Sequence, residues 1–172
     1  MNTVSKIILF ALLTGYPIFS QQVTFQDPLL DKMTGEWILQ GKIARKETTH
    51  DVSINWVLGH QYIQIHEVSR EKNASSQPDY EAIVYIGWDA TSSSYTCLWL
   101  DVTGSGGLMG DAVAHAKRNG DSLPFFFNIS GSLFHTTFVF DKNSDTWQWI
   151  MVNEENGKLQ PFARVVLTPN KR

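Results

Sequence analysis

The chain has 172 residues, and its 17 acidic side chains outnumber its 14 lysines and arginines, which gives a net charge of −3. A domain that binds nucleic acid through its phosphates carries a basic patch, so the acidic balance predicts no nucleic-acid partner. The single cysteine, Cys97, excludes an internal disulfide, and its apolar surroundings favour an inert, buried thiol.

The first twenty residues have the pattern of a secretory signal peptide. Lys6 gives a weakly positive start, residues 7–19 are mostly apolar, and residues 20–22 are polar. An apolar run of about thirteen residues is too short to span a bilayer. We therefore expect residues 1–20 to be removed near Ser20 after export to the periplasm or the extracellular space. No later apolar run is long enough to predict a transmembrane segment.

Residues 21–172 are predicted to form one domain made of strands. After a lead-in segment with one helical turn, β-branched and aromatic residues alternate between turn signals. We predict ten strands, over residues 35–46, 49–58, 60–70, 80–89, 94–102, 109–118, 122–130, 133–141, 146–154 and 160–168. Asn119-Gly120 and Asn156-Gly157 are typical of hairpin turns.

Short strands joined by hairpins predict an all-β fold, a single antiparallel up-and-down barrel of eight to ten strands, because closure leaves no free edge. Several strands are apolar on both faces, for example Phe125-Phe126-Phe127. Either the lead-in segment covers part of the outer face, or that face pairs with another subunit in a homo-oligomer.

Three motifs follow one another in the first half of the chain. Gly35-Glu36-Trp37 opens the first predicted strand, and the stretches 56–63 and 80–89 contain Trp-Val-Leu-Gly-His and Tyr-Ile-Gly-Trp-Asp. A fourth, Trp99-Leu100-Asp101, precedes a glycine-rich loop. In this order the motifs resemble the calycin-like (lipocalin-like) barrel family called domain of unknown function 1579, over residues 30–167.

This resemblance implies a barrel but no established activity. In calycins the tryptophan of the first motif lies across the base of the barrel, and a basic residue near the last strand packs on it. The resemblance therefore implies that Trp37 and Arg164 touch at the closed end. Arginine above an indole ring is stabilising by about 0.5–2 kcal/mol.

The other patterns exclude several chemistries. Residues 104–107 are glycine-rich but lack the Gly-Lys-Ser/Thr sequence and helix of a phosphate-binding loop, so they are interpreted as a loop at a barrel mouth. The five histidines have no metal-ligand spacing, and no haem-attachment motif occurs. We predict no metal site and no cofactor.

The aromatic content gives the strongest indication of function. Six Trp, five Tyr and ten Phe either fill a solid core or surround an apolar ligand. Tyr85, Trp99, Asp101 and Trp149 are predicted to line or border an interior pocket, with the 104–107 loop at its mouth. Parity alone does not fix the facing of Trp149, and a register shift of one residue would turn any of the four side chains outward.

Three functions stay open at this point. The leading one is non-catalytic binding of a small apolar or amphipathic molecule outside the cytoplasm. The second is a cofactor-free isomerase, cyclase or lyase that uses Asp101 or Glu81 with a histidine as acid and base. The third is a solid barrel acting through an external oligomerisation face. A cavity lined by rings and methyls favours the binder, and a carboxylate–histidine pair inside it favours the enzyme.

Overall fold

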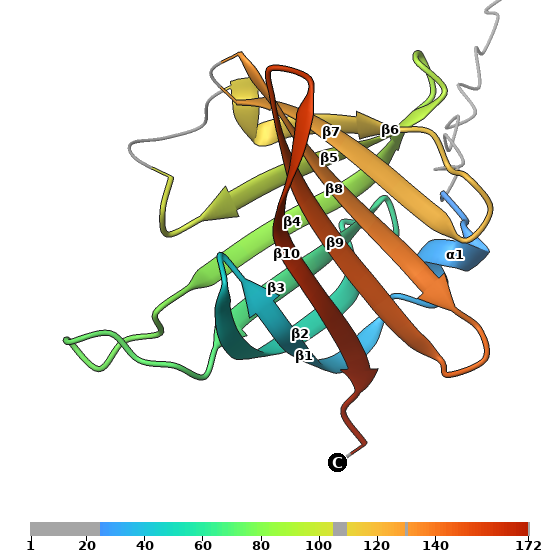
Figure 1. Cartoon of the computed structure of the whole chain (residues 1–172). Coiled ribbons are helices and arrows are strands. Elements are labelled where there is room, and N and C mark those ends of the chain that lie inside the picture. The colour runs from blue at the N-terminus through green and yellow to red at the C-terminus, as the bar shows by residue number, and fades with distance from the viewer. Residues whose placement is uncertain (1–24, 105–109, 130, 172) are drawn as a thin grey trace, which may run out of the picture.

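The computed structural model describes residues 25–104, 110–129 and 131–171, and this part of the chain is mostly strand. Ten antiparallel strands close into a barrel, with a short α-helix at one end and a turn of 3-10 helix at the other (Figure 1). The predicted fold, an antiparallel up-and-down barrel of eight to ten strands, is confirmed. The predicted signal peptide, residues 1–20, lies outside the described residues.

Each predicted strand has a counterpart in the barrel. The helix α1 spans Pro28–Asp31 and the 3-10 turn η1 spans Gly110–Ala112. The strands are β1 Gly35–Ile43, β2 Lys46–Val57, β3 Tyr62–Ser69, β4 Glu81–Asp89, β5 Ser94–Asp101, β6 Val113–Ala116, β7 Ser122–Ile129, β8 Ser132–Asp141, β9 Thr146–Glu155 and β10 Lys158–Pro169. The strand predicted over 109–118 is the most shortened, because η1 occupies part of it.

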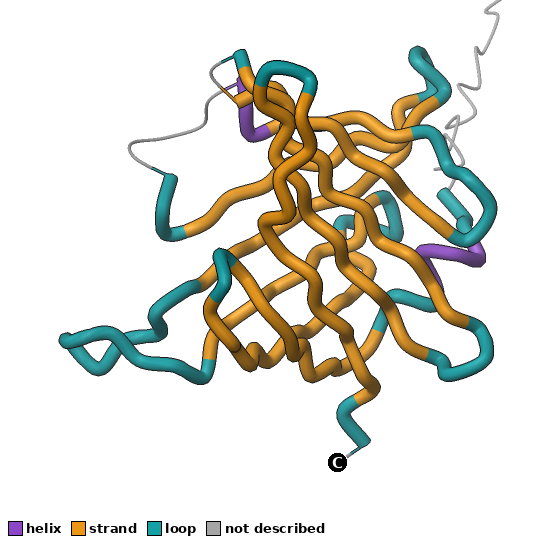
Figure 2. Tube along the Cα trace, viewed as in Figure 1, coloured by secondary structure: helices purple, strands orange, loops and turns teal. Residues whose placement is uncertain are grey.

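The strands pair in the order of the sequence, and β10 returns to pair with β1 (Figure 2). At this closure the register runs from Trp37 opposite Pro169 to Ile43 opposite Ala163. Gly41 has a φ of +148°, and a Cβ built there would lie 2.4 Å from the Arg164 carbonyl oxygen. Only glycine therefore permits the close approach of β1 and β10 at this position.

The hairpin turns use left-handed backbone conformations. Asn156 and Gly157 have φ values of 51° and 70°, as expected for an Asn-Gly turn. The first hairpin differs, because Ala44 and Arg45 take φ values of 49° and 69° without any turn-forming side chain. The predicted first strand extends to residue 46 for this reason, whereas β1 ends at Ile43.

The helix α1 closes the barrel end at which β1 begins (Figure 1). Asp27 caps it, since its carboxylate accepts hydrogen bonds from the backbone N–H groups of Leu29 at 2.7 Å and Leu30 at 3.2 Å. Leu29 and Leu30 are buried in the core. Trp37 is also buried, and its Nε1 donates to the carbonyl of Met33 at 2.8 Å. Side chains and helix together fill this end.

The predicted contact between Trp37 and Arg164 is wrong. Trp37 is buried, whereas Arg164 is exposed on the outer face of β10 and donates to Gln148 Oε1 at 3.3 Å. Arg164 is the register partner of Lys42, which is five positions along β1 from Trp37. Because alternate residues of a strand face opposite sides, the neighbours of Arg164 face the core and Arg164 itself cannot.

The lead-in residue Phe25 packs at the barrel end near α1 and not on the outer face, because Trp88 and Tyr95 are register partners on the same side as buried Ile86 and Cys97. Phe25 stacks on Trp88 with ring centroids 5.9 Å apart, and both rings lie near Tyr95. On β7, Phe125 and Phe127 are buried while Phe126 is 48% exposed. Association into a homo-oligomer through such exposed residues stays a prediction.

Cys97 lies fully buried on β5, and burial raises the pKa of its thiol. A thiol with a raised pKa is a poor nucleophile, which agrees with the interpretation of Cys97 as an inert core residue.

Within residues 25–104, 110–129 and 131–171, no helix is long and apolar enough to cross a membrane.

Candidate functional site

A cavity of about 840 Å³ occupies the barrel end away from α1. Its apolar side is made of aromatic and aliphatic residues, namely Ile43, Trp99, Leu100, Ala112, Phe127, Ile129, Phe134, Met151 and Phe162. Its polar side is made of Lys46, Thr48, His50, Glu67, Ser69, Glu71, Asp79, Tyr80, Asp101, Thr103, Asp111 and Asn153, with Gly104 beside them. A space of this size accommodates a small organic molecule.

Two neighbouring strands place much of the polar wall. Every second residue of a strand faces inward, and on both strands these residues change from apolar near α1 to polar near the cavity. The series is Ile54, Val52, His50 and Thr48 on β2, and Ile63, Ile65, Glu67 and Ser69 on β3. The two strands pair directly, so their polar ends lie side by side.

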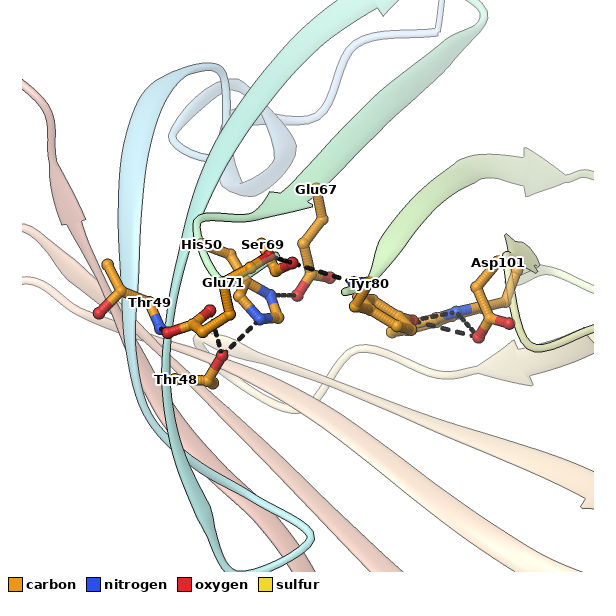
Figure 3. Close-up of polar contacts among 9 residues, drawn as sticks. Thr48, Thr49, His50, Glu67, Ser69, Glu71, Tyr80 and Asp101 are labelled. Carbon is orange, nitrogen blue, oxygen red and sulfur yellow. Dashed lines mark hydrogen bonds and ion pairs between the residues drawn. The ribbon is translucent and has the colours of Figure 1, made fainter. Parts of the chain in front are cut away.

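A buried histidine–carboxylate pair lies at the centre of this wall (Figure 3). His50 Nδ1 is hydrogen-bonded to Glu67 Oε1, and the two side chains are only 4% and 1% exposed. The other ring nitrogen, Nε2, lies 2.7 Å from Thr48 Oγ1. The second carboxylate oxygen, Glu67 Oε2, is buried and has no hydrogen-bond partner in the part of the chain that the structure describes.

Glu71, just beyond β3, extends this polar chain. Its carboxylate accepts hydrogen bonds from Thr48 Oγ1 at 3.1 Å and from the backbone N–H of Thr49 at 3.0 Å. Burial alone would raise the pKa of Glu71, but these hydrogen bonds and the nearby His50 lower it overall. The Thr48 hydroxyl thus links the His50 ring to the Glu71 carboxylate.

Tyr80, Trp99 and Asp101 form a second polar group in the cavity. The Tyr80 hydroxyl donates to Asp101 Oδ2 at 3.1 Å, and Trp99 Nε1 lies 3.2 Å from each of these two oxygens. Asp101 Oδ1 accepts from the Thr103 N–H, the Thr103 hydroxyl and the Gly104 N–H at 2.8 Å, 2.6 Å and 3.0 Å. Asp101 therefore joins the aromatic wall to the start of the glycine-rich loop, of which residues 105–107 lie outside the described residues.

Tyr80 is expected to make the protein less stable at alkaline pH. Burial and the charges of Glu67 and Asp101 raise the pKa of Tyr80, and its ring stacks on His50. An unfolded tyrosine ionises near pH ~10, so above this pH the unfolded chain has lost a proton that the folded one retains. The free energy of unfolding should therefore fall as pH rises above ~10. Denaturant titrations of wild type and Tyr80→Phe should show a shallower fall in the variant, and equal slopes would contradict this.

The structure places the four predicted pocket residues at different positions relative to the cavity. Trp99 and Asp101 line the cavity, as predicted. Trp149 is fully buried and packs against Trp99 with ring centroids 5.2 Å apart, so it borders the cavity from behind. The prediction for Tyr85 is wrong, because Val84 and Ile86 face the core and Tyr85 faces outward, where its hydroxyl accepts from Gln64 Nε2 at 2.7 Å.

Glu81 does pair with a histidine, but outside the barrel. His66 Nε2 lies 2.7 Å from Glu81 Oε1, and their side chains are 41% and 44% exposed. The pair inside the cavity, His50 with Glu67, was not among the predicted site residues. The signal that could have found it is the inward series on β2 and β3, in which both strands turn polar toward the same barrel end, with Glu67 opposite Val52 and His50 opposite Ser69.

Among the described residues, no three His, Cys, Asp or Glu side chains come together as a metal site requires.

Comparison of the chain with protein-family models and with curated proteins finds no match. The resemblance to domain of unknown function 1579 therefore stays a prediction from the motifs.

Proposed function

We propose that this protein is exported, belongs to the calycin-like family called domain of unknown function 1579, and binds one small apolar or amphipathic molecule in the barrel. Export rests on the pattern of residues 1–20, and the family on the motifs between residues 30 and 167. The observation that most supports binding is the cavity of about 840 Å³, with aromatic rings on one side and polar groups on the other.

The cavity also bears on the alternatives. Absence of a cavity would favour a solid barrel with an external oligomerisation face, and the cavity of about 840 Å³ does not support that alternative. The cavity holds both rings and a carboxylate–histidine pair, which favour the binder and the enzyme respectively. Binding is favoured over direct proton transfer to or from the ligand, because His50 Nε2 contacts the Thr48 hydroxyl and so is not open to a substrate.

An uncharged fluorescent dye such as N-phenylnaphthylamine is expected to bind at about one per chain and to quench tryptophan emission. Trp99→Ala removes a large ring from the cavity wall and should weaken binding by about 1–3 kcal/mol, the scale of one lost apolar side chain. Fluorescence titration of both proteins measures the two affinities, with circular dichroism as a check that the variant is folded.

Trp88→Ala is the matched control for this titration. Trp88 is 41% exposed, stacks on Phe25 and does not line the cavity, so its removal should leave the dye affinity unchanged. Absence of dye binding, or equal losses in the two variants, would count against the cavity as the binding site.

A second candidate is catalysis in which His50 acts on the Thr48 hydroxyl and not directly on the substrate, and one observation favours it. Glu67, His50 and Thr48 follow one another as carboxylate, imidazole and hydroxyl, the order in which hydrolases activate a nucleophile. Glu71 also accepts from the same hydroxyl, which competes with that role. Native mass spectrometry of protein purified from its own source separates the two functions. A binder retains its ligand unchanged on incubation, whereas an enzyme converts it and releases a product.

A further inference from the structure

The cavity holds more negative than positive groups. Of the described residues that line it, five are carboxylates and only Lys46 and His50 are cationic when protonated. The carboxylates are Glu67, Glu71, Asp79, Asp101 and Asp111. Lys46 is already paired with Asp79 at 2.8 Å, at the exposed rim. The interior beyond this pair is therefore acidic, and a bound cation would be stabilised there.

Most of the carboxylate oxygens in the cavity already have donors from the protein. Both oxygens of Glu71 and both oxygens of Asp101 accept hydrogen bonds from neighbouring backbone or side-chain groups. Glu67 differs from the other four carboxylates because it is buried. Its Oε1 is bonded to His50, while its Oε2 is buried without a partner within the described part of the chain.

An unpartnered oxygen on a side chain that is 1% exposed is costly, because the group has left water and gained no donor in exchange. Glu67 lines the cavity while Oε2 itself is covered by neighbouring atoms, so a bound molecule supplies the missing donor when the carboxylate turns toward the cavity. The donor that suits a carboxylate best is a charged N–H group, since charge-assisted hydrogen bonds are the stronger kind.

The rest of the cavity fits an apolar body attached to that group. Trp99 and Phe127 meet edge to face at 6.2 Å, and Phe134 and Phe162 do so at 5.4 Å. These rings line the cavity together with Met151. Aromatic faces attract cations as well as apolar groups, so they do not oppose a positive ligand.

Building on the proposed binding function, we propose that the ligand is a cationic amphiphile, an amine or related nitrogen base on an apolar body. Its N–H group donates to Glu67 Oε2, the charges of Glu71 and Asp101 stabilise the cation, and the body lies against the rings. An anionic ligand of the same shape, such as a fatty acid, is disfavoured because its carboxylate would meet the carboxylates of the wall.

Three probes that share one body test this inference, namely phenylbutylamine, phenylbutanol and phenylbutanoate. Calorimetric titration at neutral pH should show the amine binding at least about tenfold more tightly than the alcohol, the scale of one charge-assisted hydrogen bond, with the carboxylate weakest. Glu67→Gln should bring the amine and alcohol affinities together, because the side chain keeps its size but loses its charge.

Glu81→Gln is the matched control, since Glu81 pairs with His66 on the outer surface and should not affect the amine preference. Equal binding of amine and alcohol by wild type, or tightest binding of the carboxylate, would overturn the inference and leave the proposed function intact. Binding of the uncharged dye without binding of the amine would also overturn the inference and leave the proposed function intact. Failure of the dye and all three probes would overturn both.

Discussion

Trp37→Ala is expected to lower the free energy of unfolding by about 3–5 kcal/mol, the range for truncation of a large buried aromatic side chain. Trp37 is 5% exposed in the filled end of the barrel, and its Nε1 donates to the carbonyl of Met33. The substitution removes the ring and leaves a buried carbonyl without its donor. Denaturant unfolding of both proteins measures the difference.

Arg164→Ala is the control for this measurement. If Arg164 packed on Trp37, its removal would also destabilise the closed end. On the outer face, where it donates to Gln148, its removal should change stability by no more than about 0.5 kcal/mol. A large loss for Arg164→Ala with a small one for Trp37→Ala would contradict the assignment of both residues.

The fold could be predicted because its signals are local. Period-two runs and Asn-Gly turns recur along the chain, and each fixes one hairpin without reference to the rest. Ala44 and Arg45 are a turn that local signals do not predict. Their left-handed conformations are imposed by the pairing of β1 with β2 and not by their own preferences. The pairing of β10 with β1 similarly depends on the whole barrel.

The site could be predicted only in part, because facing depends on register. Trp99 and Asp101 share parity with buried Cys97, and both line the cavity as predicted. Tyr85 lies between buried Val84 and Ile86, so it faces outward and its predicted place in the pocket was wrong. The Trp37–Arg164 contact was carried over from a resemblance, and here the register places Arg164 opposite Lys42. His50 and Glu67 are 17 positions apart in the chain, and only the pairing of β2 with β3 brings them together.

His50→Leu is expected to cost about 3–5 kcal/mol of stability, because it leaves the carboxylate of Glu67 buried without its partner. Glu67 is 1% exposed, so water does not replace the lost hydrogen bond. Removing both polar groups in His50→Leu with Glu67→Leu should restore most of this loss, since an apolar pair carries no buried charge. A double-mutant cycle from denaturant unfolding gives the coupling energy of the pair.

The His66–Glu81 pair on the outer face provides the comparison for this cycle. It has the same chemistry and a 2.7 Å contact but is more than 40% exposed, so His66→Leu should cost no more than about 1 kcal/mol. Similar losses at the two histidines would show that Glu67 is not held as a buried charge.

In the apolar double variant the cavity keeps its rings and loses the carboxylate of Glu67. It should therefore bind the uncharged dye while losing its preference for the amine, because shape and charge are supplied by different residues.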